Sequence, residues 1–176
     1  REYKYGNEDR PLQPPLQEIY VPLSGQMQSS INQEVVFLDQ VDLAIENWLK
    51  ADNQPMSMLL GSYGTGKTTV TRIVSYKQAE LFQNGAIGNS RVPIIFPLRL
   101  FPKYNVVDIG GFIVSYLRNF SGLKNMDFDA FQKMNHSGKL LLIFDGFDEM
   151  GTRVDRTILK RNFAAVCSLI KTGHEK

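Results

Sequence analysis

The sequence contains one cysteine, Cys167, so no internal disulfide can form, and such cysteine usage fits a reducing compartment. It has no run near the roughly 18 apolar residues that a membrane-spanning helix needs, and no signal peptide opens the chain. It also lacks an excess of charge, since 20 lysines and arginines stand against 18 aspartates and glutamates. Because nucleic-acid-binding domains carry strongly basic surfaces, we predict a cytoplasmic protein with neither a membrane nor a nucleic-acid partner.

The composition is that of a globular domain, with 43% hydrophobic and 22% charged residues in a chain of 176. Three prolines crowd residues 11–15 without any hydrophobic period, so residues 1–30 are predicted to form an N-terminal arm or linker. Residues 31–176 are predicted to form the folded part. The chain starts with Arg1 and stops shortly after an amphipathic run, which suggests an excerpt of a longer protein.

Helical and strand patterns alternate from residue 32 onward. Hydrophobic residues at helical spacing predict helices over 32–53, 68–85, 107–120 and 155–170. Continuous apolar runs predict buried strands over 56–60, 92–100 and 140–144. Pro93 and Pro97 place the second strand at a sheet edge, because proline cannot donate to a ladder. Residues 126–134 are predicted to be less regular, and Trp48 is predicted to contact the sheet from the first helix.

This alternation predicts an α/β fold, in which a parallel sheet is covered by helices on both faces. In such sheets ligands bind at the carboxyl ends of the strands. The two unusual loops of the sequence, after Leu60 and after Phe144, both follow predicted strands. We therefore expect them to meet at one edge of the sheet.

The first loop, GSYGTGKTT, matches G-x-x-x-x-G-K-[ST] between a predicted strand and a predicted helix. Its glycines let several backbone N–H groups point inward, toward a phosphate chain at the positive end of the following helix. Lys67 would neutralise the terminal phosphates, and the Thr68 hydroxyl would bind Mg²⁺. The residues predicted to bind the nucleotide here are Gly61, Ser62, Tyr63, Gly64, Thr65, Gly66, Lys67, Thr68 and Thr69.

The second loop follows the run LLLIF and contains three carboxylates, Asp145, Asp148 and Glu149. A magnesium ion on the phosphates needs an anionic partner at this edge, so Asp145 is predicted to bind the metal together with Thr68. Asp148 or Glu149 would orient or deprotonate the attacking water, and the residues predicted to be catalytic are Lys67, Asp148 and Glu149. Gly146 would leave room where a side chain would crowd the nucleotide.

The glycine-rich loop and LLLIFDGFDE together resemble the NACHT family of signal-transduction NTPases (STAND class, NLR-related, with bacterial antiviral members). The segments EIYVPLS and PIIFPLRL are also similar to this family. The resemblance implies a three-layer αβα P-loop NTPase fold of the ASCE/STAND type. It implies a slow ATPase that binds ATP (or ADP) and Mg²⁺ and acts as a switch. Such a switch controls oligomerisation in innate immunity or antiviral defence, with effector and sensor domains elsewhere in the protein.

The resemblance also implies that residues 31–176 are the N-terminal part of a NACHT domain, truncated after the Walker B strand and the following helix. The family has a further strand between those of Leu60 and Leu142, so a gap in the sheet and poor stability of residues 1–176 alone are expected. Residues 20–23 resemble the family's segment that lies against the adenine, and Tyr20 and Val21 are the residues of it predicted to bind the nucleotide. Arg99 and the basic residues Arg153, Arg156, Lys160 and Arg161 are weaker candidates for phosphate or partner contacts.

Two alternatives stay open from the sequence. The same fold could bind nucleotide without useful turnover and act as an oligomerisation scaffold. It could also be a P-loop GTPase or a small-molecule kinase, although the sequence contains no N-K-x-D motif for guanine.

Overall fold

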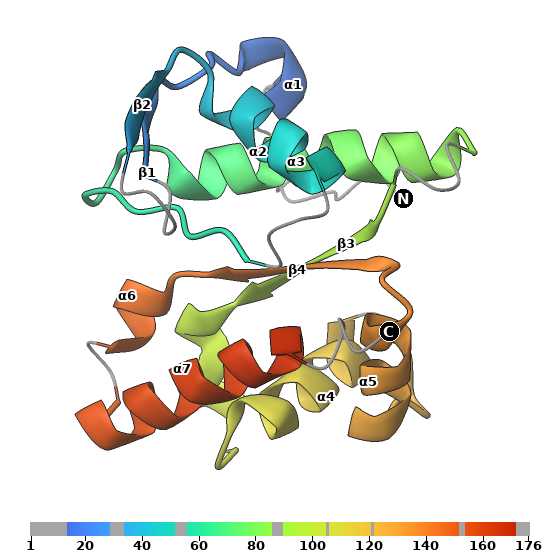
Figure 1. Ribbon diagram of the computed structural model, residues 1–176. Coiled ribbons are helices and arrows are strands. Elements are labelled where there is room, and N and C mark those ends of the chain that lie inside the picture. Colours follow the sequence, from blue (N-terminus) through green and yellow to red (C-terminus); the bar gives the residue numbers. More distant parts are fainter. Residues whose placement is uncertain are drawn as a thin grey trace, which may run out of the picture.

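The computed structural model describes residues 14–28, 34–51, 56–85, 90–104, 106–120, 122–151 and 154–171. These residues form a mixed α/β fold in which a small parallel sheet lies between two groups of helices. In Figure 1 the sheet is seen edge-on, with α2 and α3 above it and α4, α5 and α7 below it. None of the described helices is both long enough and apolar enough to cross a membrane.

The sheet pairs β3 (Val92–Pro97) in parallel with β4 (Leu140–Asp145), in a register from Val92 opposite Leu140 to Pro97 opposite Asp145. Side chains of β4 point alternately to its two faces. Leu140, Leu142 and Phe144 belong to the larger core below the sheet, whereas Leu141 and Ile143 belong to a smaller core above it. The apolar run of β4 is therefore covered on both faces, as predicted.

The larger core joins β3 and β4 to α4 (Ile109–Phe120), α5 (Phe128–His136) and α7 (Arg156–Lys171). Phe96 lies at its centre, fully buried, and its ring stacks on Phe144 at 5.2 Å between centroids. The predictions of helices near 107–120 and 155–170 are confirmed. The prediction of an irregular segment over 126–134 is wrong, because α5 starts there with Asp127 as its N-cap, accepting from the Ala130 N–H at 2.7 Å.

The strand predicted over 92–100 is shorter than expected. After Pro97 the chain turns into a 3-10 helix, η1 (Leu98–Tyr104), which buries Leu98 and Phe101 in the larger core. Two fully or nearly buried side chains three residues apart suit one face of such a helix and not a strand.

The smaller core joins α2 (Val41–Ala51) and α3 (Lys67–Gln83) to the upper face of the sheet. Val70 and Val74 of α3 are buried against Leu141, and Trp48 of α2 packs on the same cluster. Trp48 thus lies in the core that covers the upper face of the sheet, while its direct contact with a strand stays a prediction.

The helix predicted over 32–53 starts later than expected. Residues 34 to 38 include β2 (Val35–Leu38), which pairs antiparallel with β1 (Gly25–Gln28), and α2 begins only at Val41. Val35, Val36 and Phe37 are β-branched or aromatic, and such residues favour extended backbone. The hairpin has β1 before residue 30 and β2 after it, although the N-terminal arm was predicted to end at residue 30. The short helix α1 (Leu16–Ile19) precedes the hairpin. Asn32, the predicted helix start, lies outside the described residues.

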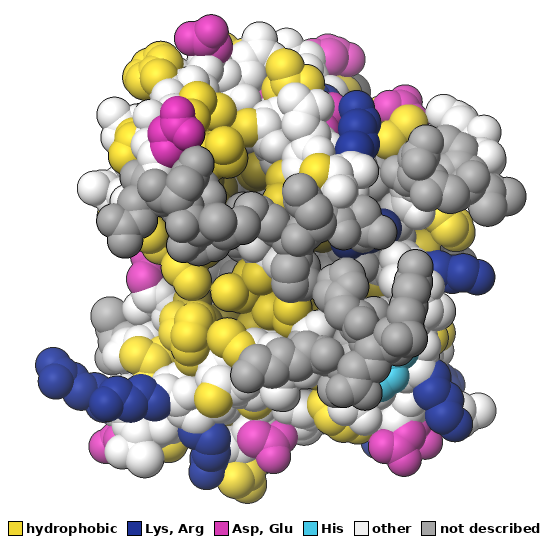
Figure 2. Space-filling view, in the orientation of Figure 1, with side chains coloured by type: hydrophobic (Ala, Val, Ile, Leu, Met, Phe, Trp, Pro, Cys, Tyr) yellow, Lys and Arg dark blue, Asp and Glu magenta, His cyan; other side chains and the backbone are white. Residues whose placement is uncertain are grey.

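The prediction of a buried strand over 56–60 is wrong. No strand is assigned to these residues, and Met56, Met58 and Leu60 are exposed. Leu59 alone of the apolar residues in this stretch packs on the smaller core. A strand requires a hydrogen-bonded neighbour, and the pairing of this sheet, as far as it is described, involves β3 and β4 only. Figure 2 shows hydrophobic side chains at the surface on one face, between the upper and lower layers.

Candidate functional site

The carboxyl ends of β3 and β4 lie at one edge of the sheet, on the left in Figure 1, where α3 begins and α6 (Phe147–Gly151) follows β4. Parallel pairing brings this about, because the register that places Pro97 opposite Asp145 makes both strands end together. The glycine-rich loop reaches the same edge through the start of α3, where Thr68 contacts Asp145, so the two predicted loops meet although residues 56–60 form no strand.

The glycine-rich loop (residues 61–69) reverses direction at two glycines in the left-handed region. Gly64 has φ +79° and Gly66 has φ +87°, a conformation that L side chains rarely adopt. Within the loop the Thr65 hydroxyl donates to the Ser62 carbonyl at 2.8 Å. Gly66 is the N-cap of α3 and supplies no side-chain cap, so the first N–H groups of α3 have no side-chain partner from that position.

Residues Gly61 to Thr65 of the loop are exposed, and residues Gly66 to Thr69 are half-buried. Tyr63 is the most exposed of them, with 94% of its surface accessible. The loop is thus open to a ligand from solvent.

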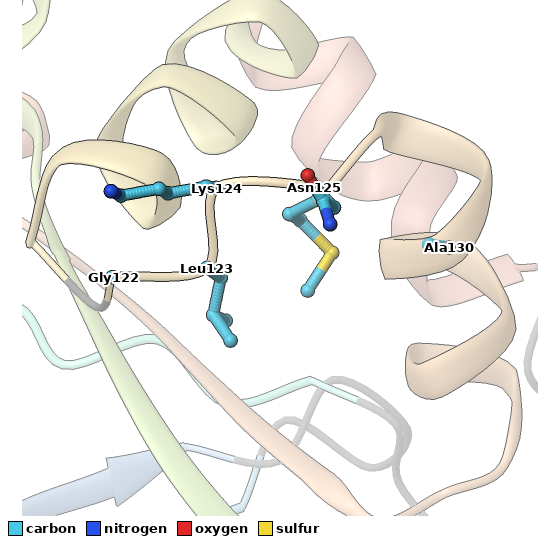
Figure 3. A pocket seen from close by; sticks show the side chains of 6 residues that line it. Gly122, Leu123, Lys124, Asn125 and Ala130 are labelled. Carbon is cyan, nitrogen blue, oxygen red and sulfur yellow. The ribbon is translucent and has the colours of Figure 1, made fainter.

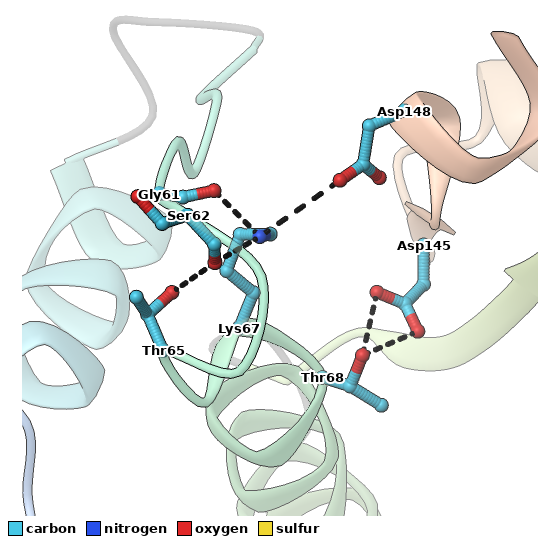
Figure 4. Close-up of polar contacts among 7 residues, drawn as sticks. All are labelled: Gly61, Ser62, Thr65, Lys67, Thr68, Asp145 and Asp148. Atoms are coloured by element: carbon cyan, nitrogen blue, oxygen red, sulfur yellow. Dashed lines mark hydrogen bonds and ion pairs between the residues drawn. The ribbon is translucent and has the colours of Figure 1, made fainter. Parts of the chain in front are cut away.

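Lys67 folds back over the loop (Figure 4). Its ammonium group donates to the Gly61 carbonyl at 2.7 Å and to the Ser62 carbonyl at 3.0 Å. It also lies 4.0 Å from the carboxylate of Asp148. The positive charge of Lys67 therefore lies between the glycine-rich loop and Asp148.

Thr68 and Asp145 are in direct contact (Figure 4). The Thr68 hydroxyl lies 3.0 Å from Oδ2 and 3.1 Å from Oδ1 of Asp145, and both side chains are half-buried. One oxygen of a threonine and two of a carboxylate form the donor set that Mg²⁺ prefers, since hard cations take oxygen ligands. The two residues predicted to bind the metal are brought together.

The other two acidic residues, Asp148 and Glu149, have different surroundings. Asp148, in the first turn of α6, is exposed and faces Lys67, whereas Glu149 is half-buried and lies beside Gly146. Gly146 has φ +80°, and a Cβ added there would meet no atom nearer than 3.7 Å. The backbone conformation thus explains this glycine without any appeal to crowding. The Arg99 backbone N lies 3.8 Å from the same point, so Arg99 is placed at this edge.

Residues 20–23, the segment predicted to lie against the adenine, contact the glycine-rich loop through Leu23. A Cβ on Gly66 would lie 2.7 Å from Leu23 Cδ1, so Leu23 packs directly on the loop backbone. Val21 is exposed, with 74% of its surface accessible. The Tyr20 hydroxyl is buried and turned toward α2, where burial and the neighbouring Asp42 charge raise its pKa. Tyr20 therefore presents its polar atom to the interior.

An ion-pair cluster that sequence reading missed lies between α2 and α3. Lys77 Nζ is 2.9 Å from Asp42 Oδ2 and 2.7 Å from Glu46 Oε1, and Asp42 is only 3% exposed. Burial alone would raise the pKa of Asp42, but the hydrogen bond and charge of Lys77 hold that pKa below its ordinary value. The spacing of four residues between Asp42 and Glu46 was a visible signal, but their shared partner was not.

The basic candidates near α7, the two histidines and Cys167 remain to be placed. His136 is exposed and Cys167 half-buried, and the described part of the chain contains no group of three His, Cys, Asp or Glu residues that could hold a metal. Arg156, Lys160 and Arg161 are exposed on α7, and Arg161 donates to the Val107 carbonyl; Arg153 and His174 lie outside the described residues. A surface pocket lies between α4 and α5, near Leu123 and Met126, and no residue of the glycine-rich loop lines it (Figure 3).

Comparison with known proteins finds a relative that is much longer than this chain. An uncharacterized WD repeat-containing protein of Nostoc sp. (strain PCC 7120) is 31% identical over 139 residues, which cover 76% of this chain. The chain spans 9% of the length of that relative. No protein-family model matches the chain, and no solved structure matches it. The chain is therefore similar to one segment of a WD repeat-containing protein.

Proposed function

We propose that the protein is the nucleotide-binding part of a NACHT-type ATPase with a P-loop fold, which binds ATP or ADP with Mg²⁺ and hydrolyses ATP slowly. The observation that carries the proposal is the contact between Thr68 and Asp145, since two residues from separate loops supply three oxygens at one point. Beside this point lie an ammonium group and a loop with two left-handed glycines.

The roles follow from the positions of the side chains. The glycine-rich loop and the start of α3 would cradle the phosphates through their N–H groups, as helix N-termini do with anions. Lys67 would exchange its contacts with the Gly61 and Ser62 carbonyls for phosphate oxygens. Thr68 and Asp145 would hold the Mg²⁺, which supplies positive charge to the phosphates when bound. Glu149 or Asp148 would orient the attacking water.

In this proposal nucleotide binding controls a larger protein. The alignment with a small part of a long relative supports a module that works beside other domains. We place effector and sensor domains outside these residues and infer that nucleotide state governs self-association, in immune signalling or antiviral defence, as in the NACHT family.

The proposal is tested by titrating the protein with a fluorescent ATP analogue in the presence of Mg²⁺. The parent protein should bind the analogue, and Lys67→Ala should lower its affinity about 10-fold to 100-fold, the scale of a lost hydrogen bond between charged groups. Lys50→Ala removes an equal charge from an exposed position on α2 and should leave affinity unchanged. Equal affinity of parent and Lys67→Ala would exclude the assigned site, and GTP competing as well as ATP would favour the GTPase alternative.

A further inference from the structure

The ion-pair cluster of Asp42, Glu46 and Lys77, in which Asp42 is buried and the other two are half-buried, has no part in the chemistry proposed above. Lys77 follows Lys67 by ten residues on α3, so it lies about 15 Å along the helix from the glycine-rich loop. A carboxylate that is 3% exposed is costly to bury, and the ion pair with Lys77 offsets part of that cost. Since the cluster lies away from the loop, any effect on the nucleotide site needs a structural partner that reaches the loop.

That partner is the segment of residues 20–23. The buried Tyr20 hydroxyl is close enough to Asp42 for the carboxylate charge to raise the pKa of Tyr20, and burial contributes first to that shift. Three residues later the Leu23 carbonyl accepts from the Val41 N–H at 2.8 Å, at the start of the helix that carries Asp42. The segment is thus hydrogen-bonded to α2 at Leu23 and buries the Tyr20 hydroxyl near Asp42, where no hydrogen-bond partner for that hydroxyl is found among the described residues.

The same segment reaches the glycine-rich loop. The Leu23 side chain occupies the space in which a Cβ on Gly66 would stand, at 2.7 Å from Cδ1. Three residues of extended chain span about 10 Å, which is enough to connect the Tyr20 anchor to this contact. A continuous chain of packed groups therefore runs from Lys77 through Asp42, Tyr20 and Leu23 to the N-cap of α3.

We propose that Lys77 is a positioning residue for the nucleotide site, and that residues 20–23 act as a strap that couples the cluster of Asp42, Glu46 and Lys77 to the glycine-rich loop. This inference rests on the proposed nucleotide binding. When the strap leaves α2, Leu23 moves away from Gly66, which frees the loop and weakens phosphate binding. Because coupling between two sites is reciprocal, bound nucleotide in turn holds the strap against α2.

The experiment combines nucleotide titration with hydrogen exchange on Lys77→Met, which keeps the length of the side chain and removes its charge. Exchange of amides in residues 14–23 should rise, while exchange in α4 and α7 below the sheet stays as in the parent. Affinity for the fluorescent ATP analogue should fall about fivefold to tenfold, the lower range of measured couplings. Lys77→Arg should restore both values, and Lys50→Met, on the exposed side of α2, should change neither.

Leu23→Ala separates the strap from the cluster. It should lower affinity to the same extent, and combining it with Lys77→Met should cause little further loss, because both variants remove one shared contact. A looser strap in Lys77→Met with unchanged affinity would overturn the coupling and leave the proposed nucleotide site intact. Exchange that rises equally in α4 and α7 would also overturn it, as a general loss of stability. If the parent protein binds no nucleotide, the proposed function fails first.

Discussion

The Thr68 hydroxyl donates to the carboxylate of Asp145, which lies 77 positions later in the chain, at 3.0 and 3.1 Å from its two oxygens. This contact joins the first turn of α3 to the last residue of β4, and so fixes the upper helices to the sheet at the edge where the loops meet. A hydroxyl and a carboxylate that contact each other here lie ready to share one cation.

Asp145→Asn should abolish the dependence of nucleotide binding on Mg²⁺. The amide keeps an oxygen that accepts from Thr68, but it removes the negative charge that a divalent cation requires. We expect the affinity for ATP measured with Mg²⁺ to fall to the value measured with EDTA, in a titration with a fluorescent analogue. Thr68→Ser keeps the hydroxyl and serves as the control, with Mg²⁺ dependence retained. Full Mg²⁺ dependence in Asp145→Asn would remove Asp145 from the metal site.

Asp148 and Glu149 are predicted to have separate effects. Asp148 lies 4.0 Å from Lys67 and competes with phosphate for its charge, so Asp148→Asn should tighten nucleotide binding. The gain should be about twofold to threefold, because exposed ion pairs are worth less than about 1 kcal/mol. Glu149→Gln removes the same charge from the next residue. It should leave the affinity for nucleotide nearly unchanged and lower ATP turnover about 100-fold or more.

Phosphate release at saturating ATP measures the turnover of both variants. Should Asp148→Asn lose turnover while Glu149→Gln keeps it, the water-orienting role belongs to Asp148.

Gly66→Ala and Gly64→Ala should differ in stability although both glycines have positive φ. At Gly64 an added Cβ meets nothing within 4 Å, so the cost is the backbone strain of about 1–2 kcal/mol. At Gly66 the added Cβ also meets Leu23 Cδ1 at 2.7 Å, and such overpacking adds about 1–3 kcal/mol. Free energies of unfolding in urea, measured without nucleotide, give the difference. Leu23→Ala introduced into Gly66→Ala should remove this excess, and failure to do so would show that Leu23 is not what the new methyl group meets.

Much of the lower half of the fold and the meeting of the two loops followed from the sequence. The run Leu140 to Phe144 is apolar because both faces of β4 are covered, and the period of α4 and α7 is long and regular. Thr68 and Asp145 were paired by the chemistry of the metal site, and they meet although the strand expected before the glycine-rich loop is absent. These features depend on local pattern or on a rule of topology, and both can be read from one chain.

The upper half depended on information that the local sequence does not contain. Val35 to Leu38 is apolar enough for either a helix or a strand, and its pairing with β1 decided the outcome. The stretch 56–60 reads as a buried strand, yet burial is set by neighbours and not by composition. Asp42 and Lys77, 35 residues apart, meet only because α2 packs on α3. Asn162, fully buried on α7 with an Oδ1 that has no partner, likewise gave no signal in the sequence.

The contribution of the Asp42 cluster to stability should depend on pH with a definite sign. The pKa of Asp42 is lowered from its ordinary 3.8, because Lys77 outweighs the effect of burial. The stability that this carboxylate adds is therefore fully present above the pKa of the unfolded state and is lost as pH falls through the lower, folded pKa. The hydrogen bond to Glu46 is the largest cause that raises the pKa of Lys77, and burial opposes it. The stability that the Lys77 ammonium group adds is therefore lost only at alkaline pH, as pH rises through the raised, folded pKa.

Asp42→Asn should accordingly destabilise the protein between about pH 5 and 9 and cease to do so in acid. We expect a loss of about 2 kcal/mol at pH 7, the scale of a hydrogen bond to a charged group, from urea unfolding. Tyr20, Glu46 and Lys77 are the ionisable groups that face Asp42 within the described part of the chain, and Asp42→Asn isolates the contribution of Asp42 because the other three stay in place. Asp129→Asn removes a carboxylate from an exposed position of α5 and is the control. It should change the free energy of unfolding by a similarly small amount at every pH. A destabilisation by Asp42→Asn that stays constant down to pH 3 would mean that packing, and not the charge on Asp42, holds α2 to α3.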